Sequence, residues 1–366
     1  MNKKYELTNE TIEHHGTVLH RIKALISFGI VKAGDLGGYI QSEDNLSHEK
    51  DCWIYNDAIV RDEAKVLDNV MVLGNAQVLD HAIVKDYSTV AGDAVVTGNS
   101  KVYDYARVSG NATVNETSEV SGDAIVRDNA IILGNAQISA YATVSCNAIV
   151  RDEAKVYGAA TVSGNAIVRG NANIYNKAIV TNGIIVGSTI NCDAVVDKDV
   201  RLRDNAYISS TNDYISTTID RGVIVTFYLS KDKDIYLTVR DHEYKLGTSY
   251  IVDLSDDTGF PLMVELAKKY LLKEKNMDCQ EITDAAIKEI QETPLRQYLK
   301  ETGINDNFFY EYKNCSRELT IFTKIPGVWI GFQGKGVNRL SEILNEQFGH
   351  EVDIQFKEMK GNFMSL

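Results

Sequence analysis

Aliphatic residues recur every six positions through the middle of the chain. From Ile54 onward every sixth residue is Val or Ile, a series of 23 positions that ends at Val186. A second series lies two residues before the members of the first, toward the N-terminus. Of its 21 positions between 58 and 178, 20 are Ala or Ser and the exception is Val70. After Val186 the phase shifts by four residues and the series resumes at Ile190.

A period of six predicts short strands. Helices and coiled coils repeat at 3.6 and 3.5 residues, so they cannot keep every sixth residue on one face. Alternate residues of a strand do share a face, so each Ala-x-Val unit predicts a short strand with both side chains inward. Gly-Asn, Gly-Asp and Asp-Asn pairs precede the alanines, and these residues tolerate the positive φ of sharp corners. The pattern predicts a triangular parallel β-helix of about nine coils, roughly 43 Å long at about 4.8 Å per coil.

Four segments follow from this pattern. Residues 1–53 precede the repeat as an N-terminal cap, and 54–210 form the β-helix. Residues 211–290 predict an α+β connecting region, with a hairpin over Val223–Leu229 and Ile235–Val239 and a helix over Pro261–Lys275. We expect this region to cover the open strand edges at the end of the solenoid.

The last segment, 291–366, predicts a small α+β domain. The fold class is therefore mainly β: a parallel β-helix followed by an α+β region. The elements expected in 291–366 are a helix over 294–301, strands over 308–312 and 318–323, two helices within 328–347 and a strand over 351–356.

The solenoid resembles a known family. Its hexads resemble the left-handed β-helix of hexapeptide-repeat proteins, best known from acyltransferases. The segment with Gly37-Gly38-Tyr39 and Asp51-Cys52-Trp53-Ile54 is similar to YdcK-type hexapeptide proteins, which are common in bacterial and phage genomes. This resemblance covers roughly 20–210; it implies a left-handed coil and carries no assigned reaction.

The C-terminal segment resembles a type II KH domain, most closely that of ribosomal protein S3. The similar stretch is Ile325-Pro-Gly-Val-Trp-Ile-Gly-Phe-Gln-Gly-Lys-Gly-Val-Asn-Arg-Leu340. The resemblance implies a Gly-x-x-Gly loop that clamps about four nucleotides of single-stranded RNA, because glycines let the backbone approach the sugar-phosphate chain. The residues assigned to nucleic-acid binding in this way are Lys324, Gly331, Phe332, Gln333, Gly334, Lys335 and Arg339.

The loop departs from its family between the two glycines. The family often carries basic residues there, whereas this chain has Phe332 and Gln333. Phe332 offers a ring on which a base can stack, but the missing charge weakens the attraction to phosphate.

Net charge and cysteine content limit the kinds of binding partner and the cellular compartment that we expect for this protein. The net charge of -13 disfavours unspecific coating of nucleic acid or of an anionic membrane. Five cysteines without a C-x-x-C pair fit neither a disulfide scaffold nor a zinc ribbon. No signal-peptide core and no run of 18 apolar residues is present in the sequence. We expect a cytoplasmic protein, in the bacterial host cytosol if a phage encodes it, with no cofactor or metal.

Enzymatic activity has one candidate residue in the coils. His81 is the single histidine there, and acyltransferases of this fold use a histidine as general base at a trimer interface. We expect His81 to be a solvated corner residue, since its hexad position carries Asn or Asp elsewhere. The Walker, G-x-S-x-G and dinucleotide-binding motifs are absent from the sequence, which favours a non-enzymatic protein.

Three functions remain open. The first is a rigid β-helix that presents a KH module to single-stranded RNA or to an RNA–protein complex. The second is a phage-type accessory or anti-defence protein that blocks a host protein assembly through acidic β-helix faces, with the KH fold only structural. The third is an acyl-CoA-dependent acyltransferase around His81. Association into trimers through the flat β-helix faces is compatible with each.

Overall fold

The computed structural model describes residues 3–219, 223–239, 242–245, 271, 308–313, 318–323, 338–342 and 353–358. Two compact units make up the chain. The first comprises residues 1–216 and 224–243, and the second comprises residues 217–223 and 244–366. Each unit is described by itself below. Among the described residues, no helix is long and apolar enough to cross a membrane.

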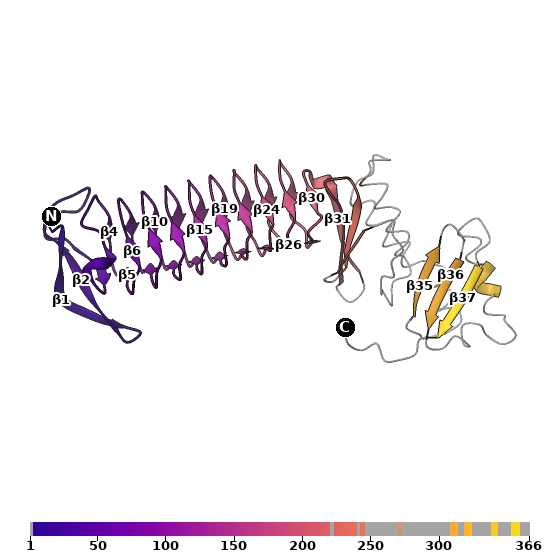
Figure 1. Cartoon of the computed structure of the whole chain (residues 1–366), viewed down its shortest axis with the longest axis horizontal. Helices are drawn as coiled ribbons and strands as arrows, with labels where there is room; N and C mark the ends of the chain where they lie inside the picture. Colours follow the sequence, from indigo (N-terminus) through magenta and orange to yellow (C-terminus); the bar gives the residue numbers. More distant parts are fainter. Residues whose placement is uncertain are drawn as a thin grey trace. The chain divides into compact units, whose positions relative to one another are not determined.

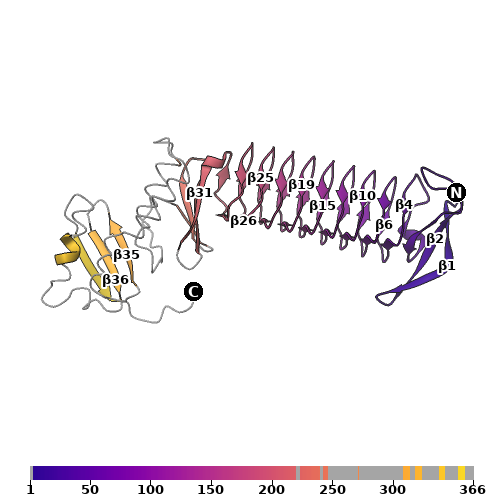
Figure 2. The same ribbon diagram turned by 180° about the vertical axis from the view of Figure 1, so that it is seen from behind.

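The first unit contains the predicted β-helix, with about nine coils of short strands stacked along one axis (Figures 1 and 2). Three parallel sheets form its three faces, and we name each after a residue type that recurs on its outer side. The isoleucine face contains β5 (Ile59–Val60), β8 (Gln77–Val78), β11 (Val95–Val96), β14 (Thr113–Val114), β17 (Ile131–Ile132), β20 (Ile149–Val150), β23 (Ile167–Arg169), β26 (Ile184–Val186) and β29 (Arg201–Leu202). The threonine face contains β4 (Trp53–Ile54), β7 (Met71–Val72), β10 (Thr89–Val90), β13 (Arg107–Val108), β16 (Ile125–Val126), β19 (Thr143–Val144), β22 (Thr161–Val162), β25 (Ile179–Val180) and β28 (Val195–Val196). The lysine face contains β6 (Lys65–Val66), β9 (Ile83–Val84), β12 (Lys101–Val102), β15 (Glu119–Val120), β18 (Gln137–Ile138), β21 (Lys155–Val156), β24 (Asn173–Ile174), β27 (Thr189–Ile190) and β30 (Tyr207–Ile208).

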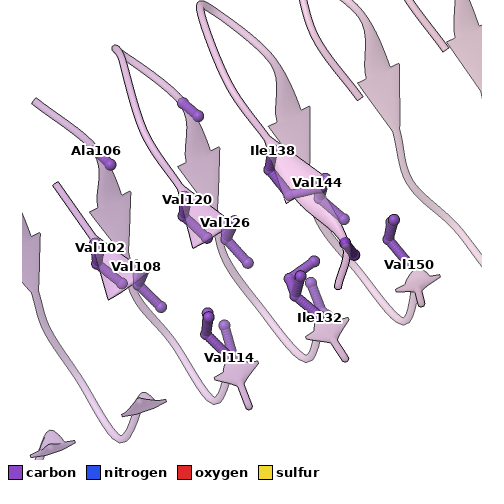
Figure 3. Packing of buried hydrophobic residues seen from close by; sticks show 14 of the residues in the cluster. Val102, Ala106, Val108, Val114, Val120, Val126, Ile132, Ile138, Val144 and Val150 are labelled. Carbon is purple, nitrogen blue, oxygen red and sulfur yellow. The ribbon is translucent and has the colours of Figure 1, made fainter. Parts of the chain in front are cut away.

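Both aliphatic series point into the core (Figure 3). Every residue of the Val/Ile series from Ile54 to Val180, and every residue of the Ala/Ser series, has no exposed surface. Each strand pairs in register with the strand one coil later, so Val102 lies opposite Val120. A small and a branched side chain per strand therefore fill the narrow interior.

Serine replaces alanine in the core only where its hydroxyl has a partner. The Ser100 hydroxyl, for example, donates to the Thr97 carbonyl at 2.7 Å, and Ser118 does the same to Asn115. Buried polar groups are costly unless they are hydrogen-bonded, and these local bonds remove that cost.

The corners of the coils adopt the left-handed backbone conformation that the Gly and Asp pairs predicted. Every sixth residue from Asn56 to Asn176 has φ between 55° and 78°. All of these residues are Gly, Asp or Asn except Glu116, Ala140 and Cys146. Because a Cβ atom is unfavourable in this conformation, this row explains the corner composition.

One detail of the predicted register is wrong. The inward residue after Val180 is Ile185, which has no exposed surface, whereas Val186 is half-buried. The core row therefore runs Val180, Ile185, Ile190, in two steps of five residues. Gly183 and Gly187, with φ of 93° and 63°, form the corners of these shorter steps.

The N-terminal segment extends the isoleucine-face sheet beyond the first coil. It contains β1 (Tyr5–His14), β2 (Thr17–Ala24), β3 (Leu36–Ile40) and the short helix η1 (Glu43–Asn45). Strands β1, β2 and β3 are antiparallel neighbours, and β3 pairs with β5 in parallel. The rings of Tyr5 and Phe28 both lie edge-on against Trp53, which is 1% exposed. The first coil is thereby shielded from solvent.

A second sheet covers the other end of the solenoid. It follows η2 (Thr211–Asp213) and has the order β31 (Tyr214–Ile219), β32 (Val223–Leu229), β33 (Ile235–Val239) and β34 (His242–Lys245). The predicted hairpin is confirmed as β32 and β33. The Arg201 backbone N–H donates to Thr226 Oγ1 at 3.1 Å, and the Asn205 amide donates to Glu243 at 2.6 Å. The second sheet thus provides hydrogen-bond acceptors for the Arg201 backbone N–H and the Asn205 side-chain amide of the last coil.

The second unit contains a three-stranded mixed sheet. Strands β35 (Phe308–Lys313) and β36 (Glu318–Thr323) are antiparallel, and β37 (Asp353–Glu358) is parallel to β36. All three strands were predicted, although β37 begins two residues later than expected. Residues 338–342 are helical, and so is Leu271, which is buried. The rest of the helix predicted over Pro261–Lys275, and the helix predicted over 294–301, lie outside the described residues.

Candidate interaction surfaces

The flat faces of the solenoid carry few acidic groups. Among the outward residues of the strands from β5 to β30, the single carboxylate is that of Glu119. The isoleucine face instead carries Ile131, Ile149, Ile167 and Ile184 in register on four adjacent strands. The expectation of acidic faces is therefore wrong about location: the carboxylates of the coils concentrate at the corners, because Asp is one of the few residues suited to the left-handed corner position.

Many corner carboxylates are engaged by the backbone of the next coil. The Asp152 carboxylate accepts a hydrogen bond from the Gly170 N–H at 2.9 Å. Asp80 accepts from the Gly98 N–H at 3.1 Å and from the Thr97 hydroxyl. The Thr97 hydroxyl and then the Gly98 N–H lower the pKa of the Asp80 carboxyl, because they stabilise its charged form. These groups hold coils together and are poorly placed to act as acids or bases.

The edge between the threonine and isoleucine faces is an amide ladder. The side-chain amides of Asn111, Asn129 and Asn147 donate in sequence to the amide oxygens of Asn129, Asn147 and Asn165, each one coil later, at 3.0, 3.1 and 3.2 Å. Asparagine ladders of this kind stabilise stacked parallel strands. This edge thus has a structural explanation.

The edge between the lysine and threonine faces is aromatic, and we call it the tyrosine edge. Six of the eight tyrosines between residues 54 and 208 lie along it. The rings of Tyr87 and Tyr105 stack 5.2 Å apart, and those of Tyr157 and Tyr175 stack 5.0 Å apart. The six residues of the tyrosine edge are Tyr87, Tyr103, Tyr105, Tyr141, Tyr157 and Tyr175. Sequence reasoning missed this edge; the signal is a spacing of 18 residues, one coil, between Tyr87 and Tyr105 or between Tyr157 and Tyr175.

His81 lies on the third edge, between the isoleucine and lysine faces. Its imidazole Nδ1 is 3.2 Å from Glu63 Oε2, and the two side chains are 60% and 77% exposed. In the part of the chain that the structure describes, no group of three or more His, Cys, Asp or Glu side chains could hold a metal ion. His81 and Glu63 are thus two solvent-exposed corner side chains within hydrogen-bonding distance of each other.

A buried lysine and cysteine lie under the N-terminal strands. Lys4 Nζ donates to the Cys52 carbonyl at 2.9 Å and to Cys52 Sγ at 3.3 Å, and it lies 4.8 Å from the centre of the Phe28 ring. Burial lowers the pKa of the Lys4 ammonium and raises the pKa of the Cys52 thiol. The pair fixes the start of β1 to the first coil. Cys146 and Cys192 are exposed corner residues.

One of the residues expected to bind nucleic acid lies within the described part of the chain. Arg339 is helical and exposed, and its guanidinium lies 3.3 Å from Glu342. On the same helical turn, Leu340 is fully buried. The other expected residues lie outside the described residues: Lys324, Gly331, Phe332, Gln333, Gly334 and Lys335.

No protein-family profile matches this chain, and comparison with curated proteins finds no similar sequence.

Proposed function

We propose that the protein is a non-enzymatic binding protein, in which a left-handed hexapeptide β-helix serves as a rigid scaffold and a type II KH module binds single-stranded RNA or an RNA–protein complex. The observation that carries the proposal is the parallel pairing of β36 and β37. In the sequence, the motif Gly331-Phe-Gln-Gly334 lies between these two strands and shortly before the helical residues 338–342.

The strand arrangement supports this assignment. Two antiparallel strands followed by a third strand parallel to the second agree with the type II KH order, in which two helices connect the last two strands. A parallel connection needs a crossover of a dozen or more residues, and residues 324–352 supply that length. A glycine-rich loop at the start of a helix can offer backbone N–H groups to phosphate. Arg339, exposed on the helical turn, adds a cation.

The solenoid supports a scaffold role. Successive coils are joined by backbone hydrogen bonds along all three faces, and both core rows are fully buried. A closely packed, hydrogen-bonded stack of this kind resists bending. It can therefore hold a binding module without contributing chemistry itself.

Fluorescence anisotropy with labelled single-stranded RNA, at low and at physiological salt, tests the proposal. We expect salt-dependent binding by the full chain. The Phe332→Asp/Gln333→Asp variant should bind at least about tenfold more weakly, because loss of one stacked base costs about 1–3 kcal/mol and the new charges repel phosphate.

Gln355→Asp is the matched control, since Gln355 is exposed on β37 and the substitution adds a charge to the same module outside the loop. It should retain most of the affinity. Absence of RNA binding by the wild type at low salt, or equal losses in both variants, contradicts the proposal.

A second function, docking to a host protein assembly as in a phage-type accessory or anti-defence protein, is favoured by the exposed aromatic rings of the tyrosine edge. Exposed aromatic side chains are typical of protein interfaces.

A further inference from the structure

We propose that the tyrosine edge docks an arginine-rich segment of a partner protein. The contact residues are Tyr87, Tyr105 and Tyr141, together with the neighbouring carboxylates of Asp104 and Asp123. This inference is independent of RNA binding by the C-terminal module, because every contact residue lies in the solenoid.

The fold does not require tyrosine at these three positions. Tyr87, Tyr105 and Tyr141 are 56%, 56% and 68% exposed, so their rings contribute little to the core. The same corner position holds Asn69 in one coil and Asp123 in another, and the pairing of the coils is unchanged there. Polar residues would serve the solenoid equally well, so the exposed rings need another explanation.

The exposed rings are concentrated on this edge. Among the described residues, the exposed aromatic side chains are those of Tyr87, Tyr105 and Tyr141. Tyr87 and Tyr105 occupy adjacent coils with their rings 10° from parallel. Tyr141 follows two coils later, about 10 Å further along, a distance that three residues of an extended peptide span. The rings thus form a preorganised row, which lowers the entropic cost of binding an extended segment.

The charge beside the rings selects a cation. Asp104 and Asp123 are exposed next to the tyrosines. One oxygen of Asp104 accepts the Gly122 N–H at 3.0 Å, so the other oxygen is the one that can bind a guanidinium group. One cation already lies against this edge, since Lys85 Nζ is 5.3 Å from the centre of the Tyr103 ring. Aromatic faces attract cations, and carboxylates bind guanidinium groups with charge-assisted hydrogen bonds. The same carboxylates, in a chain of net charge -13, repel RNA phosphate from this edge.

Arginine fits this combination better than lysine. Its guanidinium is planar and can stack on a tyrosine ring while its N–H groups reach a carboxylate, whereas the compact lysine ammonium holds its water more strongly. A partner segment with an arginine at every third position would place successive guanidinium groups at the spacing of Tyr105 and Tyr141.

The test is a titration of the full chain with three labelled peptides of the repeating pattern Arg-Gly-Gly, Lys-Gly-Gly and citrulline-Gly-Gly. We expect the arginine peptide to bind more tightly than the lysine peptide, and the neutral citrulline peptide to bind weakly. The variant is Tyr87→Ser/Tyr105→Ser/Tyr141→Ser. It should bind the arginine peptide about tenfold more weakly or worse, since each ring–cation contact contributes about 0.5–1 kcal/mol at an exposed site.

Asn99→Ser/Thr117→Ser/Asn135→Ser is the matched control, because these residues occupy the equivalent corner position on the edge that carries His81. It should bind like the wild type. If the triple tyrosine variant does not fold, Tyr141→Ser alone provides the comparison, with an expected loss of a fewfold.

Three results would overturn the proposal. They are absence of binding to the arginine peptide, equal binding of the arginine and lysine peptides with no effect of the tyrosine substitutions, and loss of RNA binding in the tyrosine variant. The second result indicates unspecific attraction to an acidic protein, and the third assigns the edge to nucleic acid.

Discussion

The carboxylate of Asp128 accepts a hydrogen bond from the backbone N–H of Cys146, one coil further along the solenoid, at 3.0 Å. Both residues adopt the left-handed backbone conformation, with φ of 62° and 59°. One corner position thus has two requirements: a residue that tolerates positive φ, and an acceptor for the next coil. Aspartate meets both, which explains why so much of the negative charge of the coils lies at corners. The same contact joins Asp62 to Asp80, Asp68 to Asp86, Asp86 to Asp104, Asp104 to Gly122 and Asp152 to Gly170.

Removal of the corner carboxylate should destabilise the stack. We expect Asp128→Ala to cost about 1–2 kcal/mol of unfolding free energy, because it removes a hydrogen bond to a charged group while keeping a Cβ atom in the left-handed conformation. Asp128→Asn, which keeps an acceptor, should cost less. Chemical denaturation measures both, with Asp123→Ala as the control at an exposed corner position outside the left-handed row. An equal effect of Asp128→Ala and Asp123→Ala would show that the inter-coil bond contributes nothing.

Two substitutions of Cys146, which lies at a left-handed corner, should change the free energy of unfolding in opposite directions. Glycine has no Cβ atom, so Cys146→Gly should raise the unfolding free energy by up to about 1 kcal/mol. Cys146→Val should lower it by about 1–2 kcal/mol or more, because a branched side chain is disfavoured at positive φ. Melting temperatures of the two variants check this. Equal melting temperatures would mean that the corner is not held in the left-handed conformation.

The change of register is testable at two adjacent residues. Ile185 is fully buried and Val186 is not. Ile185→Ala should therefore cost about 2–4 kcal/mol, as expected for a core aliphatic residue. Val186→Ala should cost less than about 1 kcal/mol. A larger loss of stability in Val186→Ala than in Ile185→Ala would show that Val186 is the inward residue, as the uninterrupted six-residue series predicts.

Alkaline pH should weaken the C-terminal end of the first unit through Tyr228. Burial, and then its hydrogen bond to Glu243, raise the pKa of the Tyr228 phenol well above the ordinary 10.0. The folded state keeps the proton after the unfolded chain has lost it. The stabilisation is therefore present below pH 10 and is lost as pH rises above it. In pH-dependent unfolding, Tyr228→Phe should reduce the loss above pH 10, whereas Tyr141→Phe at an exposed site should not. An unchanged pH profile in Tyr228→Phe would contradict this assignment.

Local pattern was enough to predict the solenoid. A period of six between small and branched residues fits neither a helix nor a coiled coil, and the structure has the stacked short strands that it predicted. Hydrophobicity could not distinguish Ile185 from Val186, because both are branched aliphatic residues. The distinction depends on Gly183, whose corner shortens the step. The hairpin of β32 and β33 and the three strands of the second unit were equally visible in the alternation of their residues.

The candidate surfaces were harder to predict, because they form only when folding brings residues of successive coils next to each other. Tyr87 and Tyr105 are 18 residues apart in sequence and stack in the fold. Likewise, the corner carboxylates looked like acidic faces until the coil placed residues such as Asp128 against the backbone of the next turn. Conversely, the RNA-binding hypothesis depends on the resemblance of residues 325–340 to KH domains and on the strand order of β35, β36 and β37.

The most direct test of the proposed function is photochemical cross-linking of the full chain to single-stranded RNA that contains 4-thiouridine, followed by mass spectrometry of the linked peptides. We expect cross-links within residues 324–339, at or beside Phe332, and a sharp decrease in the Phe332→Asp/Gln333→Asp variant. Cross-links confined to residues 54–208, or none while a known single-strand-binding protein cross-links under the same conditions, would contradict the proposed function.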